Sequence, residues 1–225
     1  MVSPFLFFAD ERMALAELTA ACLDGILVAL GEGFMPADAV ESPWMRARSL
    51  RPLLGDRWAA VRASAAWIHG GQTVEPTRHH AQRVSAIRHI VRGTARAQYH
   101  EVRLGAADVV TVAGVHVTTP ARTLIDLARS GDAAERAVAC AWAAEEPRIA
   151  AAATLWLRAH PRFPYGRRAV DALRYARGAA EPGDDEQPIS RSREMLDGRP
   201  GSRVTAIARA GADEDRVAPQ EDVTR

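Results

Sequence analysis

The sequence of 225 residues lacks several residue types, and each absence limits what the chain can be. It contains neither lysine nor asparagine, so all 29 basic residues are arginine. The two cysteines, Cys22 and Cys140, lie in separate apolar stretches and form no CxxC or Cys/His ligand spacing. We therefore expect no metal site and no disulfide framework, but two small buried thiols in a reducing cytosol.

Targeting segments and catalytic motifs are also missing. The N-terminal "PFLFF" is too short for a signal peptide, and "EEPR" interrupts the alanine-rich stretch near 137–157. The chain has no G-x-S-x-G hydrolase motif and no phosphate loop, and "YHEVRL" has Leu104 where HExxH requires its second histidine. We expect a cytoplasmic, non-enzymatic protein with no cofactor, no membrane contact and no small-molecule substrate.

Positive charge is concentrated in the middle of the chain, although the net charge is only +1. Residues 77–103 contain six arginines, four histidines, Tyr99 and a single acidic residue, Glu101. Arginine suits phosphate, and histidine and tyrosine suit stacked bases, so one interpretation is a surface for DNA or RNA. The other is the ordinary solvated face of half-buried strands. The candidate nucleic-acid-binding residues are Arg83, Arg88, Arg92, Arg96 and Arg103.

The spacing of apolar residues in the first third predicts helices around one hairpin. Residues 10–25 form a helix with Asp10 as N-cap, and residues 26–37 form two short strands that turn at 31–33. A second helix begins at Pro43 after the cap residue Ser42. The stretch 56–71 is predicted as one helix that Gly70 stops.

The remaining two thirds predict an α+β chain with a tail. Short strands are expected between 79 and 118, with Ala113 and Gly114 at a turn, and helices at 120–130, about 132–144, about 148–159 and about 164–177. Three parts follow: a helix plus hairpin at 1–40, a mixed α/β domain with a small antiparallel sheet and C-terminal helices at 41–178, and a disordered acidic and arginine-containing tail at 179–225.

The stretch "VTTPARTLIDL", residues 117–127, predicts a strand-to-helix corner. The hydroxyl of Thr119 can cap the helix, and Pro120 fits its first position, where no N–H is needed. Arg122 and Asp126 are four residues apart on one helical face. A catalytic interpretation of this pair requires a nucleophile or an acid/base partner, and the stretch contains none. We interpret Thr119, Pro120, Arg122 and Asp126 as a structural motif.

Four stretches resemble the AbiEi-type antitoxin family, in particular its actinobacterial members. "GVHVTTPARTLIDLA" is similar to the family's Gly-Val-x-Val-Thr-Ser/Thr-Pro-x-Arg-Thr-Leu-x-Asp-Leu-Ala signature. "ASAAWIHGG" resembles a family helix with a His-Gly stop, and "AQYHEVRLGAADVVTVAGV" resembles the two strands before the signature. "LDGILVALGEGFMPAD" resembles the end of the winged-helix domain that normally opens these proteins.

The resemblance implies a transcriptional regulator and antitoxin. Such proteins repress their own operon through an N-terminal winged helix. Their C-terminal domain neutralises a nucleotidyltransferase toxin in the type IV manner, without a stable complex. Here the helices before the hairpin are missing or vestigial, and "ILVALGEGF" has no arginine to meet phosphates. We therefore expect a reduced winged helix that does not read DNA by itself.

The alternative is a catalytically dead remnant of a protein fused to a very-short-patch-repair-like endonuclease. "QPISRSREML" at 187–196 faintly resembles the opening of that nuclease. Ser190 stands where the nuclease has a glutamate, and the strands that carry its metal-binding acids do not follow.

Overall fold

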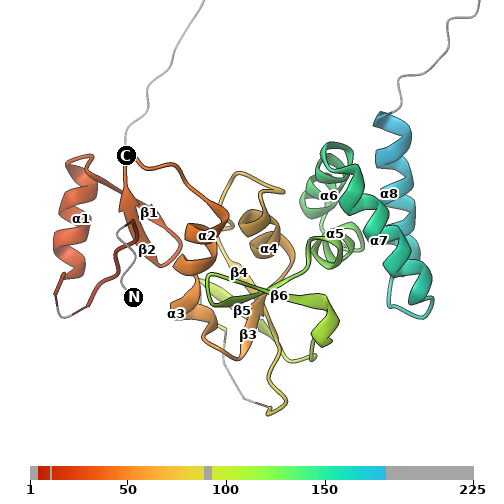
Figure 1. Ribbon diagram of the computed structural model, residues 1–225, viewed down its shortest axis with the longest axis horizontal. Helices are drawn as coiled ribbons and strands as arrows, with labels where there is room; N and C mark the ends of the chain where they lie inside the picture. The colour runs from red at the N-terminus through yellow and green to blue at the C-terminus, as the bar shows by residue number, and fades with distance from the viewer. Residues whose placement is uncertain (1–4, 11, 89–92, 181–225) are drawn as a thin grey trace, which may run out of the picture. The chain divides into compact units, whose positions relative to one another are not determined.

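A computed structural model of the chain describes residues 5–10, 12–88 and 93–180 (Figure 1). Residues 179 and 180 are described by their backbone alone. These residues belong to one compact unit, Met1–Gly183. The fold is α+β, as predicted, with a hairpin, a five-stranded sheet and a group of C-terminal helices. The described residues do not include positions 89–92, which contain Arg92 and part of the stretch in which short strands are expected. They also do not include the nuclease-like stretch at 187–196 or nearly all of the expected tail.

The hairpin expected near the N-terminus is confirmed. Strand β1 (Leu27–Leu30) pairs antiparallel with β2 (Gly33–Pro36), and Leu30 lies opposite Gly33. The helix before it, α1 (Leu15–Leu23), begins later than predicted. Asp10 does not cap that helix, because its carboxylate accepts hydrogen bonds from the backbone N–H groups of Arg12 and Met13 in a turn of their own.

The second helix begins where the sequence predicts. Helix α2 (Pro43–Ser49) is capped by Ser42, whose hydroxyl accepts from the N–H of Met45 at 3.3 Å. A short helix, α3 (Arg51–Leu54), follows with Pro52 in its first turn. Pro52 therefore separates two helices, as its missing N–H and its ring require.

The prediction of one helix over residues 56–71 is wrong for the first part of that stretch. Residues Trp58–Ala60 form strand β3, and the helix α4 occupies only Arg62–His69 before Gly70 ends it at φ 84°. All three residues of β3 are buried, because the strand lies in the middle of the sheet. A strand buried on both faces is continuously apolar, and periodicity alone does not distinguish it from a buried helix.

The main sheet has the strand order β5-β4-β3-β7-β6. Its other strands are β4 (His79–Arg83), β5 (Ala97–His100), β6 (Val109–Val112) and β7 (Val115–Thr118). The sheet is mixed rather than only antiparallel: β3 pairs antiparallel with β4 and parallel with β7, and β4 pairs parallel with β5. Strands β6 and β7 form a hairpin whose turn, Ala113–Gly114, has positive φ at both positions.

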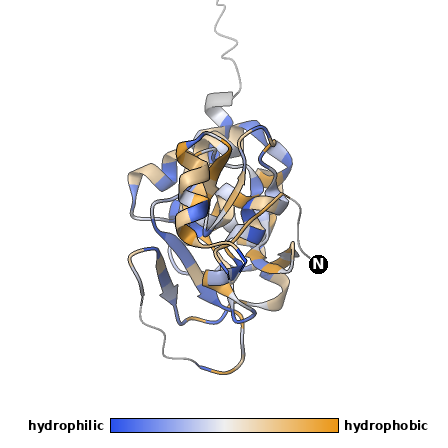
Figure 2. Cartoon of the chain, turned by 90° about the vertical axis from the view of Figure 1, so that its left-hand side faces the viewer, coloured by the Kyte–Doolittle hydropathy of each residue, from blue (hydrophilic) through white to orange (hydrophobic). Residues whose placement is uncertain are grey.

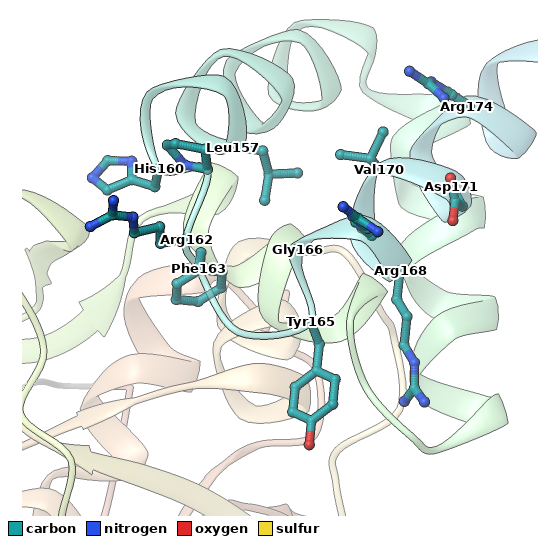
Figure 3. A pocket seen from close by; sticks show the side chains of 12 residues that line it. Leu157, His160, Arg162, Phe163, Tyr165, Gly166, Arg168, Val170, Asp171 and Arg174 are labelled. Atoms are coloured by element: carbon teal, nitrogen blue, oxygen red, sulfur yellow. The ribbon is translucent and has the colours of Figure 1, made fainter.

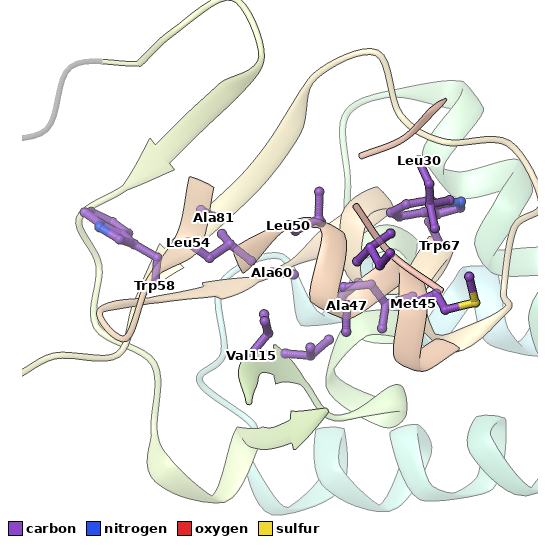
Figure 4. Packing of buried hydrophobic residues seen from close by; sticks show 14 of the residues in the cluster. Leu30, Met45, Ala47, Leu50, Leu54, Trp58, Ala60, Trp67, Ala81 and Val115 are labelled. Carbon is purple, nitrogen blue, oxygen red and sulfur yellow. The ribbon is translucent and has the colours of Figure 1, made fainter. Parts of the chain in front are cut away.

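Two main clusters of buried side chains hold these elements together. In the first, Leu50 before α3, Leu54 at the end of α3 and Trp67 of α4 pack with Ala60 and Val115 of the sheet (Figure 4). The strands on either side of the grey segment 89–92, β4 and β5, are coloured mainly hydrophilic in Figure 2. The sheet is thus apolar at its centre, and this edge of it is polar.

The second cluster surrounds helix α5 (Pro120–Ala128), which contacts α4, α6 (Ala133–Glu145), α7 (Pro147–Ala159) and α8 (Gly166–Ala180). Every residue of α5 from Arg122 to Ala128 is buried. A helix buried all round is typical of the centre of a helical group. No helix within the described ranges combines the length and apolar character that crossing a membrane requires.

Candidate functional site

The signature stretch forms the junction between the sheet and the buried helix. Strand β7 ends at Thr118, and the hydroxyl of Thr119 accepts a hydrogen bond from the N–H of Arg122 at 3.3 Å. Pro120 occupies the first helical position. The hydroxyl groups of Thr118 and Thr123 form a hydrogen bond of 2.7 Å inside the corner. These contacts satisfy backbone groups at the start of α5, which the core would otherwise leave without partners.

Arg122 lies at the centre of a buried charge cluster. Its Nε donates to Asp126 at 3.0 Å, and its Nη1 donates to Asp108 at 2.5 Å. The side chains of Arg122 and Asp126 are 8% and 2% exposed, so this is no surface pair. The indole N–H of Trp156 donates to the second oxygen of Asp108 at 2.8 Å, and Arg129 donates to Asp126 at 2.9 Å. All the carboxylate oxygens in this cluster therefore have a donor.

Sequence reasoning found Arg122 and Asp126 but missed Asp108 and Trp156. Asp108 lies just before β6 and Trp156 lies in α7, so no local spacing connects either of them with α5. The only signal in the sequence is that an arginine inside an apolar helix needs a carboxylate partner. The helical spacing supplies Asp126, and the fold supplies Asp108.

Two of the stretches with a family resemblance meet at His69. The Nε2–H of His69, at the end of α4, donates to the carbonyl oxygen of Thr118 at 2.7 Å. Burial lowers the pKa of His69, and the bond to Thr118 opposes that shift. The ring stacks on Trp142 of α6, and a Cβ at Gly71 would come within 2.4 Å of Trp142. The end of α4, in the stretch "ASAAWIHGG", is thus bonded to the end of β7, in the stretch "GVHVTTPARTLIDLA".

The candidate arginines lie at both ends of the parallel pair β4 and β5. At one end, Arg83 donates to the carbonyl oxygens of Glu101, Ser85 and Ala86. Arg88 is 81% exposed there, and its Nε lies 3.9 Å from the Glu101 carboxylate. Arg103, in the loop after β5, is also exposed. Arg88 and Arg103 are therefore exposed to a ligand, although Arg88 also lies at ion-pair distance from Glu101, whereas Arg83 is occupied by the protein.

Arg96 lies at the opposite end of these strands and contacts the N-terminal hairpin. It donates to Glu32 at 3.1 Å, to the carbonyl oxygen of Gly31 at 3.1 Å and to Glu75 at 3.1 Å. Glu75 also accepts from the N–H of Gly31 at 3.0 Å. A Cβ at Gly31 would come within 2.2 Å of Ser49, so the hairpin turn packs closely on α2. We call this set, Gly31, Glu32, Glu75 and Arg96, the hairpin latch.

Histidines connect the latch to the exposed edge of the sheet. His79 is fully buried between Glu75 at 3.2 Å and the hydroxyl of Ser64 at 3.2 Å. His80 and His100 stack on each other, with ring nitrogens 3.1 Å apart. Burial and the charge of Arg62 lower the pKa of both, that of His80 to about 4. Both rings are therefore neutral at pH 7, and one donates to the other.

These histidines do not form a metal centre. Among the described residues, no group of three or more His, Cys, Asp or Glu side chains is arranged to hold a metal ion. Cys22 and Cys140 are free thiols and only partly buried.

Comparison with known families identifies the part of the chain that carries this geometry. Residues 58–147 match the family described as the AbiEi antitoxin C-terminal domain. The matched segment contains the whole five-stranded sheet, α4, the signature corner, α5 and α6. Residues 58–147 therefore belong to the AbiEi-type antitoxin family, and the chain carries an antitoxin domain of a toxin–antitoxin system. No curated protein matches the chain.

Proposed function

We propose that the chain is the antitoxin of a type IV toxin–antitoxin system and counteracts a nucleotidyltransferase toxin in the cytoplasm, without catalysis and without a stable complex. The observation that carries the proposal is the family match at residues 58–147. Within that segment the signature residues are integrated in the fold, since Arg122 and Asp126 are buried and bonded to each other, Arg122 also to Asp108 and Asp126 also to Arg129.

Growth rescue tests this proposal. The full chain is expressed together with a nucleotidyltransferase toxin of a type IV system, and we expect it to restore growth. Affinity capture from the same cells should recover no toxin, because the proposed mechanism needs no stable complex. A folded chain that fails to restore growth would refute the proposed activity. Stoichiometric recovery of the toxin would instead contradict the type IV manner of neutralisation.

We propose nucleic-acid binding as a second activity, since Arg88 and Arg103 are exposed at the same end of β4 and β5. Two phosphate contacts correspond to a slope of log affinity on log salt of about −1.4 to −1.8. Filter binding of a duplex and a structured RNA across a salt series measures this slope. Replacement of both arginines by glutamine should flatten it, and Arg148→Gln with Arg158→Gln, exposed on α7, is the matched control. An equal effect of both pairs would leave Arg88 and Arg103 as a solvated face.

The hairpin is not proposed as a DNA reader. Residues 26–36 contain no arginine, and the turn at Gly31 is held by the hairpin latch. Specific binding of the chain's own promoter by a fragment covering residues 1–40 at about 0.15 M salt would contradict this view.

A further inference from the structure

A cleft of about 670 Å³ lies beside the buried charge cluster, and the antitoxin function described above does not explain it. One wall is formed by residues of α5 and the turn after it, including Arg122, Asp126 and Arg129. The opposite wall comes from Phe163 and from the beginning of α8. Gln82 and His100 of the sheet also line it. The volume is in the usual range for small-molecule sites, about 300–1,000 Å³.

Two side chains at the mouth of the cleft are available to a ligand. Tyr165 is 64% exposed, and Arg168, whose guanidinium lies 5.2 Å from the tyrosine ring, is exposed as well. Figure 3 shows both side chains pointing in the same direction, away from His160. Arg168 forms no ion pair with any described residue. An aromatic face and an unpaired guanidinium thus lie next to each other.

The other charges of the cleft are balanced inside the protein. Arg122 and Arg129 both bond to Asp126, and their guanidinium carbons lie 4.8 and 4.7 Å from the centre of the Phe163 ring. Arg62 is paired with Glu135 and bonded to Ser130. The charges of these three arginines are therefore compensated by Asp108, Asp126 and Glu135. Among the arginines that line the cleft, Arg168 has no carboxylate partner within the described residues.

The backbone at this cleft is strained at two places. Among the described residues, three other than glycine have positive φ: Arg62 at 53°, Ala113 at 51° and Tyr165 at 58°. Ala113 is explained by its hairpin turn, but Arg62 and Tyr165 both line the cleft. Such a conformation costs about 1–3 kcal/mol per residue and is concentrated at ligand sites, where it fixes the direction of a side chain. Tyr165, whose ring is exposed, thus has an uncommon backbone conformation at this cleft.

We propose that this cleft binds a nucleoside phosphate, with the base stacked on Tyr165 and the phosphate held by Arg168. Arginine is suited to phosphate because its planar fork matches the oxygen geometry, and an aromatic ring stacks on any base. The ligand is bound and not converted. The same chemistry is offered by a free mononucleotide and by the terminal nucleotide of an RNA.

Calorimetric titration of the full chain tests the proposed site and distinguishes a free mononucleotide from the terminal nucleotide of an RNA as its ligand. The probes are the four nucleoside monophosphates, inorganic phosphate, a short linear RNA and the same RNA circularised. We expect Arg168→Gln to weaken binding about tenfold, as the loss of one charge-assisted contact implies. Arg167→Gln is the matched control, because Arg167 is an equally exposed neighbour that does not line this cleft. Tyr165→Leu should also weaken nucleotide binding while leaving phosphate binding unchanged.

Each result supports or overturns the proposal. Mononucleotide binding that Arg168→Gln weakens and Arg167→Gln leaves intact supports a free nucleotide as the ligand. Binding of the linear RNA alone, with the same pattern of variants, supports the terminal nucleotide. Equal weakening by both arginine variants means general charge attraction and overturns the site. Absence of binding at millimolar probe overturns it too, and no effect of Tyr165→Leu overturns the stacking of a base.

Discussion

At the scale of single residues, Arg122 shows how a buried charge depends on its surroundings. We predict that Arg122→Met lowers the free energy of unfolding by about 3–5 kcal/mol, because Asp108 and Asp126 would remain buried without their common partner. Urea unfolding followed by circular dichroism measures the change. The matched control is Arg158→Met on the exposed side of α7, which should stay within about 0.5 kcal/mol. A loss below about 1 kcal/mol at Arg122 would mean that water replaces the guanidinium.

The cap residue of α5 leads to a smaller prediction. Thr119→Ala removes the hydroxyl that accepts from the N–H of Arg122, and we expect a loss of about 1 kcal/mol. Thr119→Ser keeps the hydroxyl and should restore most of the stability. The thermal midpoint, measured together with the growth-rescue activity, separates two roles. An unchanged midpoint with abolished rescue would make Thr119 a functional residue rather than a cap.

At the scale of elements, the hairpin latch joins β1 and β2 to the main sheet through Arg96. We predict that Arg96→Gln frees the hairpin locally, since it removes the bonds to Glu32, Glu75 and the Gly31 carbonyl oxygen. The ion pairs are partly exposed, so the expected global loss is only about 0.5–1 kcal/mol.

Limited proteolysis reports this local opening. Cleavage within residues 24–40 should become faster in Arg96→Gln, while cleavage in the rest of the chain stays slow. Arg88→Gln is the control with the same change of charge, since Arg88 is 81% exposed and does not contact the hairpin. Equal cleavage rates in both variants would show that the packing of Gly31 on Ser49 alone holds the hairpin.

The sequence predicts those elements whose signals are local. Ser42, Gly70 and the Ala113–Gly114 turn act on the residues beside them, and all three stand where they were expected. Strand β3 was missed because its burial on both faces comes from partners far away in the chain. Arg96 is similar, since nothing near it in the sequence indicates that its partners are Glu32 and Glu75. Composition identified a basic segment, but tertiary contacts decide which of its arginines are free.

At the scale of the whole molecule, neutral histidines make stability depend on pH. The pKa values of His69, His80 and His100 are lowered, first by burial, and that of His80 to about 4. The unfolded chain therefore binds these protons below about pH 6.5, while the folded chain does not. The stability that follows from these neutral histidines is fully present above pH 6.5. It is lost as the pH falls toward the pKa values of the histidines in the folded chain.

We predict that the free energy of unfolding decreases by about 1–3 kcal/mol between pH 7.5 and 5, a range reduced for the partial exposure of His80 and His100. Urea titrations at several pH values measure it. His80→Gln should make the dependence flatter, whereas His160→Gln, at an exposed position after α7, should leave it unchanged. Greater stability at pH 5 than at pH 7.5 would contradict the neutral state of these rings.

The central position of β3 also has a consequence for the order in which the chain is synthesised. Ala59 and Ala60 need β4 on one side and β7 on the other, and the parallel partner lies at residues 116 and 117. Strand β3 therefore leaves the ribosome well before β7, its second partner in the sheet, has been synthesised. Until the signature corner has left the ribosome, this apolar strand has an open edge, which is a hazard for wrong pairing with other chains. During synthesis the sheet can therefore be completed, and α5 can pack beside it, only after residues 115–128 have left the ribosome.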